Sequence, residues 1–407
     1  MQGESCNESG GNVTVVINPR DRLELRRVVD AVALDRAAQL RVDLRNQRHV
    51  TIDLSQAQFI DHDALLLMGG MTAYRKRRGM STSFNLPWSD SVMDFLRTWA
   101  FPDFMQAVCA PSPAFTEESE MALQESSHRL PKYVSFQMEG NERRAVLLRE
   151  SLQITPITIT GDAWADAGLA TSRFLNENFR AVMNRSLGDR GDSNVANIVH
   201  EAALNAATHP GARLAFTSCH VRKRQPDDPV EGRSYELQLA IWDDGASLAG
   251  TLGAALDRGA AITADRFGEE GATFDLVIQR DHEGVELLSF DDSEPPVSRD
   301  STVLSSAAFM LGVTSDPSRS RQAATTFPNA APSVRQSGGV GLALLRTRTI
   351  DAFGGRVIYR SGDLRLEISA GAQENHYTFH INVVPDDGWP IEGNLLLVDI
   401  PLGGRAK

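Results

Sequence analysis

The chain has 407 residues, of which 42% are hydrophobic and 23% are charged. This length and composition are typical of a folded protein of about two or three domains, and they exclude wholesale disorder. The 53 acidic residues outnumber the 41 basic ones, and the resulting net charge of −12 disfavours nucleic acid or an anionic membrane as a partner. The 3 cysteines are too few and too scattered for a disulfide framework or a zinc cluster.

Targeting segments are not evident in the sequence. No apolar run reaches the roughly 18–20 residues of a membrane span. Residues 1–11 are polar and do not resemble a signal peptide, so we expect them to form a flexible tail. We therefore expect a cytoplasmic protein without a membrane partner.

The first part of the chain, residues 12–110, alternates strand and helix patterns, which predicts a small α/β domain. The predicted strands are 13–19, 50–54 and 80–86. The predicted helices are 21–40, 61–78 and one that begins at Ser89. Residues 111–132 are rich in Pro, Ser, Ala and Glu, a composition that predicts a linker.

The second part, residues 133–407, also mixes the two patterns. Its predicted helices are 169–186, 193–209 and 341–352. Its predicted strands are 213–221, 234–242, 355–360, 364–369, 376–383 and 394–400. Residues 246–337 are rich in Gly, Asp, Ser and Pro, and this composition predicts a long irregular stretch.

The first candidate motif is a polar stripe on the predicted helix over 193–209. Glu201, Asn205 and His209 are spaced i, i+4 and i+8, so they share one face of a helix. Asn205 can give a hard cation an oxygen ligand, and Glu201 can act as general base on a nucleophile that attacks a γ-phosphate. The alternative is a solvated polar face without a ligand.

The second candidate motif closes the predicted strand over 234–242. Asp243 at the end of this strand can accept a hydrogen bond from an exocyclic amine such as that of adenine. Gly245 lets the backbone approach a ring closely. The alternative is a hairpin turn, which an Asp-Gly pair strongly favours.

The third candidate motif is a glycine-rich segment before the predicted helix over 341–352. Free backbone amides at Gly338, Gly339 and Gly341 can bind phosphate oxygens. The alternative is a flexible loop before a helix. Arg346 and Arg348 follow on this helix. One of them could reach a phosphate, but we expect both at the surface.

In this order, the three segments resemble the nucleotide-binding boxes of the Bergerat-fold ATPases of the GHKL group. This group contains gyrase-type and chaperone ATPases, histidine kinases and anti-sigma serine kinases. The E-x-x-x-N-x-x-x-H run is similar to the N-box, and IWDDGAS is similar to the D-x-G-x-G box. GGVGLAL is similar to the G-x-G-L-G box, and NLLLVDIPL to the closing strand of the fold. The resemblance covers residues 150–402.

The resemblance implies a two-layer α/β sandwich that binds ATP and Mg²⁺, with residues 246–337 as an extended ATP lid or insertion. It implies Glu201 as the catalytic residue and Asn205 as the magnesium ligand. The implied nucleotide-binding residues are Asn205, His209, Asp243, Gly245, Gly338, Gly339, Gly341 and Leu342. Ser247 and Ala343 stand where the group has glycines. No phosphoacceptor-histidine helix pair precedes the domain, so an ordinary sensor histidine kinase is not expected.

Residues 12–108 resemble the STAS domain of anti-anti-sigma factors. In that family a phosphorylatable serine lies at the start of a helix. Here the corresponding residues are Asp61-His62-Asp63-Ala64, and the acceptor position falls on Asp63, which has no hydroxyl. Asp63 can mimic a permanently charged state, or Asp61 and Asp63 can simply cap the helix.

These patterns leave three functions open. The first is a regulatory protein that binds Mg-ATP and hydrolyses it to switch a protein partner. The second is a serine/threonine protein kinase of the anti-sigma type. The third is a non-catalytic nucleotide-binding module for assembly. Dimers are common among these ATPases, so a homodimer is also open.

Overall fold

The computed structural model describes residues 13–16, 48–54, 62–86, 90–126, 134–139, 142–147, 151–160, 164–174, 192–223, 235–258, 272–280, 284–291, 299–310, 341–383 and 390–402. The chain divides into two compact units, the first within Met1–Ser135 and the second within Phe136–Pro385 and Pro390–Lys407. Each unit combines helices with a sheet, which confirms the α/β class predicted from the sequence.

The first unit contains a three-stranded parallel sheet with neighbouring strands in chain order. Its strands are β1 (Val13–Val16), β2 (His49–Asp53) and β3 (Ser81–Asn85). Its helices are α2 (His62–Arg77), α3 (Asp90–Thr98), α4 (Phe101–Cys109) and α5 (Glu117–Ser126). Phe84 of β3 packs edge-on against Phe101 of α4 with ring centroids 6.0 Å apart. The helix predicted over 21–40 lies outside the described residues, as do residues 1–11 and Asp61.

The segment predicted to be a linker, 111–132, differs from that expectation in its described part. Phe115 is buried and pairs with Phe84 of β3, and the hydroxyl of Ser119 accepts a hydrogen bond from Leu86 N at 2.8 Å. Residues up to the first turn of α5 therefore belong to the core of the first unit. The composition of the segment did not indicate this burial, because it has few apolar residues and these few are the ones that are buried.

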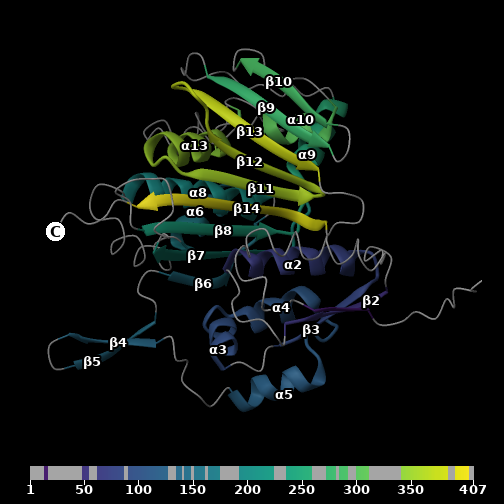
Figure 1. Cartoon of the computed structure of the whole chain (residues 1–407), viewed down its shortest axis with the longest axis vertical. Helices are drawn as coiled ribbons and strands as arrows, with labels where there is room; N and C mark the ends of the chain where they lie inside the picture. The colour runs from purple at the N-terminus through teal and green to yellow at the C-terminus, as the bar shows by residue number, and fades with distance from the viewer. Residues whose placement is uncertain are drawn as a thin grey trace, which may run out of the picture. The chain divides into compact units, whose positions relative to one another are not determined.

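The second unit is built on a mixed sheet that has nine strands among the described residues, in the order β10-β9-β13-β12-β11-β14-β8-β7-β6 (Figure 1). Its strands are β6 (Ser151–Pro156), β7 (Ala215–Lys223), β8 (Tyr235–Asp243), β9 (Thr273–Arg280), β10 (Gly284–Asp291), β11 (Arg356–Gly362), β12 (Leu364–Ala370), β13 (His376–Val383) and β14 (Ile391–Leu402). Neighbouring strands are antiparallel except for β13 and β9, which are parallel. A separate two-stranded sheet joins β4 (Val134–Glu139) and β5 (Glu142–Leu147).

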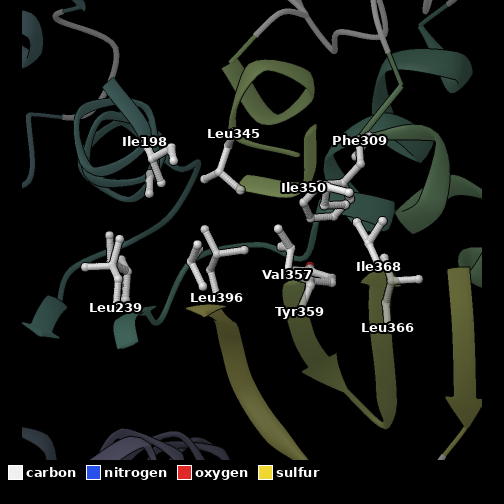
Figure 2. Packing of buried hydrophobic residues seen from close by; sticks show 14 of the residues in the cluster. Ile198, Leu239, Phe309, Leu345, Ile350, Val357, Tyr359, Leu366, Ile368 and Leu396 are labelled. Atoms are coloured by element: carbon white, nitrogen blue, oxygen red, sulfur yellow. The ribbon is translucent and has the colours of Figure 1, made fainter. Parts of the chain in front are cut away.

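Helices pack on one face of this sheet and bury their apolar stripes against it. They are α6 (Trp164–Phe174), α8 (Asp192–Thr208), α9 (Leu248–Asp257), α10 (Ser301–Ala307), α13 (Gly341–Thr347) and the π-helix η2 (Arg348–Ala352). Figure 2 shows Ile198 of α8 and Leu345 of α13 pointing toward Leu239 and Leu396 of the strands. This packing holds α8 and α13, which carry the first and third motifs, on the same face of the sheet.

The strands β4, β5 and β6 were not predicted from the sequence. The elements that were predicted after them agree with the structure except in three places. The helix predicted over 169–186 begins earlier, at Trp164, and residues 175–186 lie outside the described part of the chain. The helix predicted over 341–352 changes from α to π geometry at Arg348.

The third difference is the stretch 246–337, which was predicted to be irregular. It contains α9, the β9–β10 hairpin and α10, and β9 extends the main sheet by pairing with β13. Phe274, Leu276 and Ile278 of β9 are buried in the core. The helices α9 and α10 and the strand β9 of this stretch therefore contribute to the folded core. Residues 259–271 and 311–340 lie outside the described residues.

Among the helices in the described ranges, none combines the length and the apolar character that crossing a membrane requires.

Candidate functional site

The first part of the site is built on α8, which the sequence folds as one amphipathic helix. Val195, Ile198 and Val199 bury its apolar side in the core. Glu201 is carried into the interior with them and is only 6% exposed. Asn205, one turn later, is partly exposed. Glu201 and Asn205 thus lie on one face of α8, as predicted, at the boundary between core and surface.

The start of α13 lies directly against these two side chains. A Cβ atom added to Gly341 would lie 2.6 Å from Glu201 Oε2 and 3.7 Å from Asn205 Nδ2. Any larger residue at position 341 would therefore push against the Glu201 carboxylate. The convergence of the first and third motifs, which are far apart in sequence, is confirmed at this point. Gly338 and Gly339 lie outside the described residues.

Burial sets the electrostatic character of Glu201. It raises the pKa of this carboxyl from 4.5 to about 7, although the positive charge of Arg348 acts to lower it. A carboxyl group that titrates near neutral pH can accept a proton efficiently under physiological conditions, as a general base must.

Two polar groups beside Glu201 are buried without a hydrogen-bond partner in the part of the chain that the structure describes. They are Asn205 Nδ2 and Arg348 Nη1. Arg348 is half-buried, so it is less exposed than its predicted surface position implies. Buried donors in native proteins are almost always paired with protein, water or ligand, so each of these two atoms has room for an acceptor.

Arg346, also predicted at the surface, is fully buried instead. Its guanidinium carbon lies 4.1 Å from the ring centroid of Tyr377 and 4.7 Å from that of Phe274. The favourable contact between a cation and two aromatic faces compensates for burying the charge. Arg346 thereby attaches α13 to β13 and β9.

The second motif forms a buried polar cluster at the other end of α8. His209 Nδ1 lies 3.0 Å and 2.9 Å from the two carboxylate oxygens of Asp243. The backbone N–H of Gly245 donates to Asp243 Oδ1 at 2.9 Å. Burial would lower the pKa of His209, but the charge of Asp243 and its hydrogen bond outweigh burial and raise that pKa. His209 thus holds the Asp243 carboxylate in place.

Asn394, at the start of the apolar part of β14, completes this cluster and was not identified from the sequence. Its Nδ2 donates to Asp243 Oδ1 at 3.0 Å and to Ala246 O at 2.9 Å. Its Oδ1 accepts a hydrogen bond from the Tyr359 hydroxyl at 2.6 Å, and that hydroxyl accepts from Leu248 N at 3.1 Å. The cluster therefore connects β8, β14 and β11 with the first turn of α9.

We expect Asn394→Ala to lower the free energy of unfolding by about 2–4 kcal/mol. The substitution removes a donor from the Asp243 carboxylate and leaves the Tyr359 hydroxyl without its acceptor, and each such loss costs about 1–3 kcal/mol. Thermal or urea unfolding measures the change. The matched control is Asn382→Ala, on an exposed position of β13. Equal stability of the two variants would contradict a structural role for the cluster.

The remaining motif residues have structural partners. Ser247, which stands where the GHKL group has a glycine, caps α9 by accepting a hydrogen bond from Gly250 N at 2.9 Å. Leu342 is half-buried and packs against the main core, and Ala343 is buried. A Cβ on Gly245 would lie 3.1 Å from Pro210 O and 3.1 Å from His209 Cβ, so the turn after β8 passes close to the end of α8.

The two clusters lie along one helix. At 1.5 Å per residue, Glu201 and Thr208, the last residue of α8, are about 10 Å apart along the helix, and His209 follows just beyond the helix end. Comparison with family models, with curated proteins and with solved structures finds no match to the chain, so this geometry and the sequence motifs are the basis for assigning a function.

Proposed function

We propose that the chain is a regulatory protein that binds Mg-ATP beside α8 and the start of α13 and hydrolyses it to switch a protein partner. The observation that carries the proposal is the contact of Gly341 with Glu201 and Asn205. This contact joins the two segments that resemble the N-box and the G-x-G-L-G box of the GHKL ATPases. The carboxylate of Asp243, held in place by His209, is the polar group that would recognise adenine.

Glu201 is the proposed general base. Its carboxylate can take a proton from a water molecule that attacks the terminal phosphate, and its raised pKa suits this transfer near neutral pH. Asp243 Oδ2 lies 2.9 Å from His209 Nδ1, which fixes the orientation of the carboxylate. A carboxylate oxygen has two lone pairs, so Asp243 Oδ2 can also accept from an exocyclic amine.

The residues present fit a magnesium ion that is held mainly by the nucleotide. In the described ranges, no cluster of three or more His, Cys, Asp or Glu side chains can hold a metal. Magnesium bound with a nucleotide usually takes only one or two protein oxygens, together with phosphates and water. The carboxamide of Asn205, whose Nδ2 has no partner among the described residues, is free to supply that oxygen. When bound, the ion would neutralise charge on the phosphates.

Nucleotide binding tests the proposal directly. We expect the full chain to bind Mg-ATP in isothermal titration calorimetry and Asn205→Ala to bind it at least about tenfold more weakly, because one charge-assisted contact contributes about 1.5–3 kcal/mol. Asn382→Ala, on exposed β13, is the control and should bind like the unsubstituted chain. Absence of Mg-ATP binding, or equal affinity of the Asn205 variant, would reject this site.

A further inference from the structure

The two unpartnered groups beside Glu201 are both hydrogen-bond donors. Asn205 Nδ2 belongs to an amide and Arg348 Nη1 to a guanidinium, and each is buried with no acceptor in the described part of the chain. A donor is satisfied only by an acceptor, so the missing component must carry oxygen atoms with free lone pairs. For a guanidinium, the best acceptors are carboxylate and phosphate oxygens.

Glu201 is the acidic side chain whose charge interacts with Arg348, yet the two do not pair. Neither residue has an ion pair within 4.0 Å in the described ranges, although the charge of Arg348 acts to lower the pKa of the Glu201 carboxyl. Arg348 is therefore left with a buried nitrogen that Glu201 does not satisfy.

The local backbone explains how a charged side chain reaches this place. Arg348 follows Gly341 by seven residues, two turns, so both lie on the same side of the helix, toward α8. The helix changes to π geometry at Arg348, and π segments are frequent at functional sites. Gly341 has no side chain, which keeps the space beside Glu201 and Asn205 clear.

We propose that Arg348 is a phosphate-binding residue of the nucleotide site, whose guanidinium donates to a phosphate oxygen on the side where Glu201 acts. This inference rests on the proposed function and deepens it. Asn205 would supply its Oδ1 to the metal, and its unpartnered Nδ2 would be available to a phosphate oxygen. Arg348 then makes the site select nucleotides that carry phosphates over nucleosides.

Calorimetry with three probes tests this role: Mg-ATP, adenosine, and inorganic tripolyphosphate with Mg²⁺. We expect Arg348→Gln to weaken Mg-ATP and tripolyphosphate about 10- to 100-fold, which is the range for hydrogen bonds to a charged group. Adenosine affinity should change less than about threefold. Arg348→Lys, which keeps the charge but loses the planar fork, should lie between. Arg258→Gln, at an exposed arginine after α9, is the control.

The outcomes separate this inference from the proposed function. Equal affinity of Arg348→Gln and the unsubstituted chain for Mg-ATP would overturn the role of Arg348 and leave the nucleotide site intact. A parallel loss of adenosine affinity in both Arg348 variants would also overturn it, since that indicates a structural defect. If the unsubstituted chain binds tripolyphosphate through Arg348 but not ATP, the proposed function fails and the phosphate site stands. Binding of none of the probes rejects both.

Discussion

Glu201→Gln is expected to slow ATP hydrolysis about 100- to 10,000-fold while Mg-ATP still binds. A positioned general base contributes about this much to a rate. Glutamine keeps the shape of the side chain that lies against Gly341, but it cannot accept a proton near neutral pH. The measurement is phosphate release at saturating Mg-ATP with no protein acceptor present, accompanied by a binding titration of the same variant.

The control for this variant is Glu374→Gln, at an exposed turn position, which should hydrolyse ATP at the unsubstituted rate. For the unsubstituted chain, kcat/KM should rise as pH increases through about 7, because the deprotonated carboxylate is the active form and burial raises its pKa to that value. A Glu201→Gln rate within threefold of the unsubstituted chain would contradict the role of general base. Transfer of label to a co-purified protein, without phosphate release, would instead favour the kinase alternative.

The common helix face of Glu201 and Asn205 was predictable because it depends on a short-range pattern, the i, i+4 spacing. The glycines before the next motif's apolar helix predicted only backbone amides that could bind phosphate oxygens. Neither pattern needs knowledge of the tertiary packing. The resemblance of three segments in order then indicated which helices would meet.

Asn394 and Arg348 illustrate what the sequence could not provide. Asn394 stands before a run of apolar residues and, in the sequence, is typical of a polar strand end. Its role depends on the pairing of β14 with β8. The two strands approach so closely that a Cβ on Gly393, which has a φ of +74°, would overlap the backbone of Asp243. Arg348 was expected at the surface because arginine is rarely buried unless paired. Its burial depends on the packing of α13 against α8. The spacing between Gly341 and Arg348 places both on one side of the helix, but it does not show that this side faces α8.

The β9 strand was missed for a different reason. Its sequence alternates buried Phe274, Leu276 and Ile278 with more exposed residues, a strand pattern of period 2. The surrounding abundance of Gly, Asp, Ser and Pro in residues 246–337 obscured this short signal. Composition averaged over a long window is thus a poor guide where a hairpin is inserted into an otherwise irregular stretch.

The second large effect concerns stability and does not depend on any ligand. Glu201→Gln is expected to raise the unfolding temperature by about 6–10 °C at pH 8 and by less than about 2 °C at pH 5. Burial raises the pKa of Glu201 from 4.5 to about 7, so the folded state holds a proton that the unfolded state releases. The stability from this proton is complete below pH 4.5 and is lost as pH rises through about 7.

The total change is up to about 3 kcal/mol, since each pKa unit corresponds to about 1.4 kcal/mol and about 1 kcal/mol shifts the unfolding temperature by 2–4 °C in a unit of this size. Glutamine is uncharged at every pH, so the Glu201→Gln variant does not lose this stability.

Differential scanning calorimetry of both proteins between pH 5 and 8 measures the effect, with Glu374→Gln as control. The difference in unfolding temperature between chains with glutamate and with glutamine at position 201 has a midpoint in pH. In the Arg348→Gln background this midpoint should move to higher pH, because the charge of Arg348 lowers the Glu201 pKa. A difference that is independent of pH would show that the Glu201 carboxylate is not destabilised by burial.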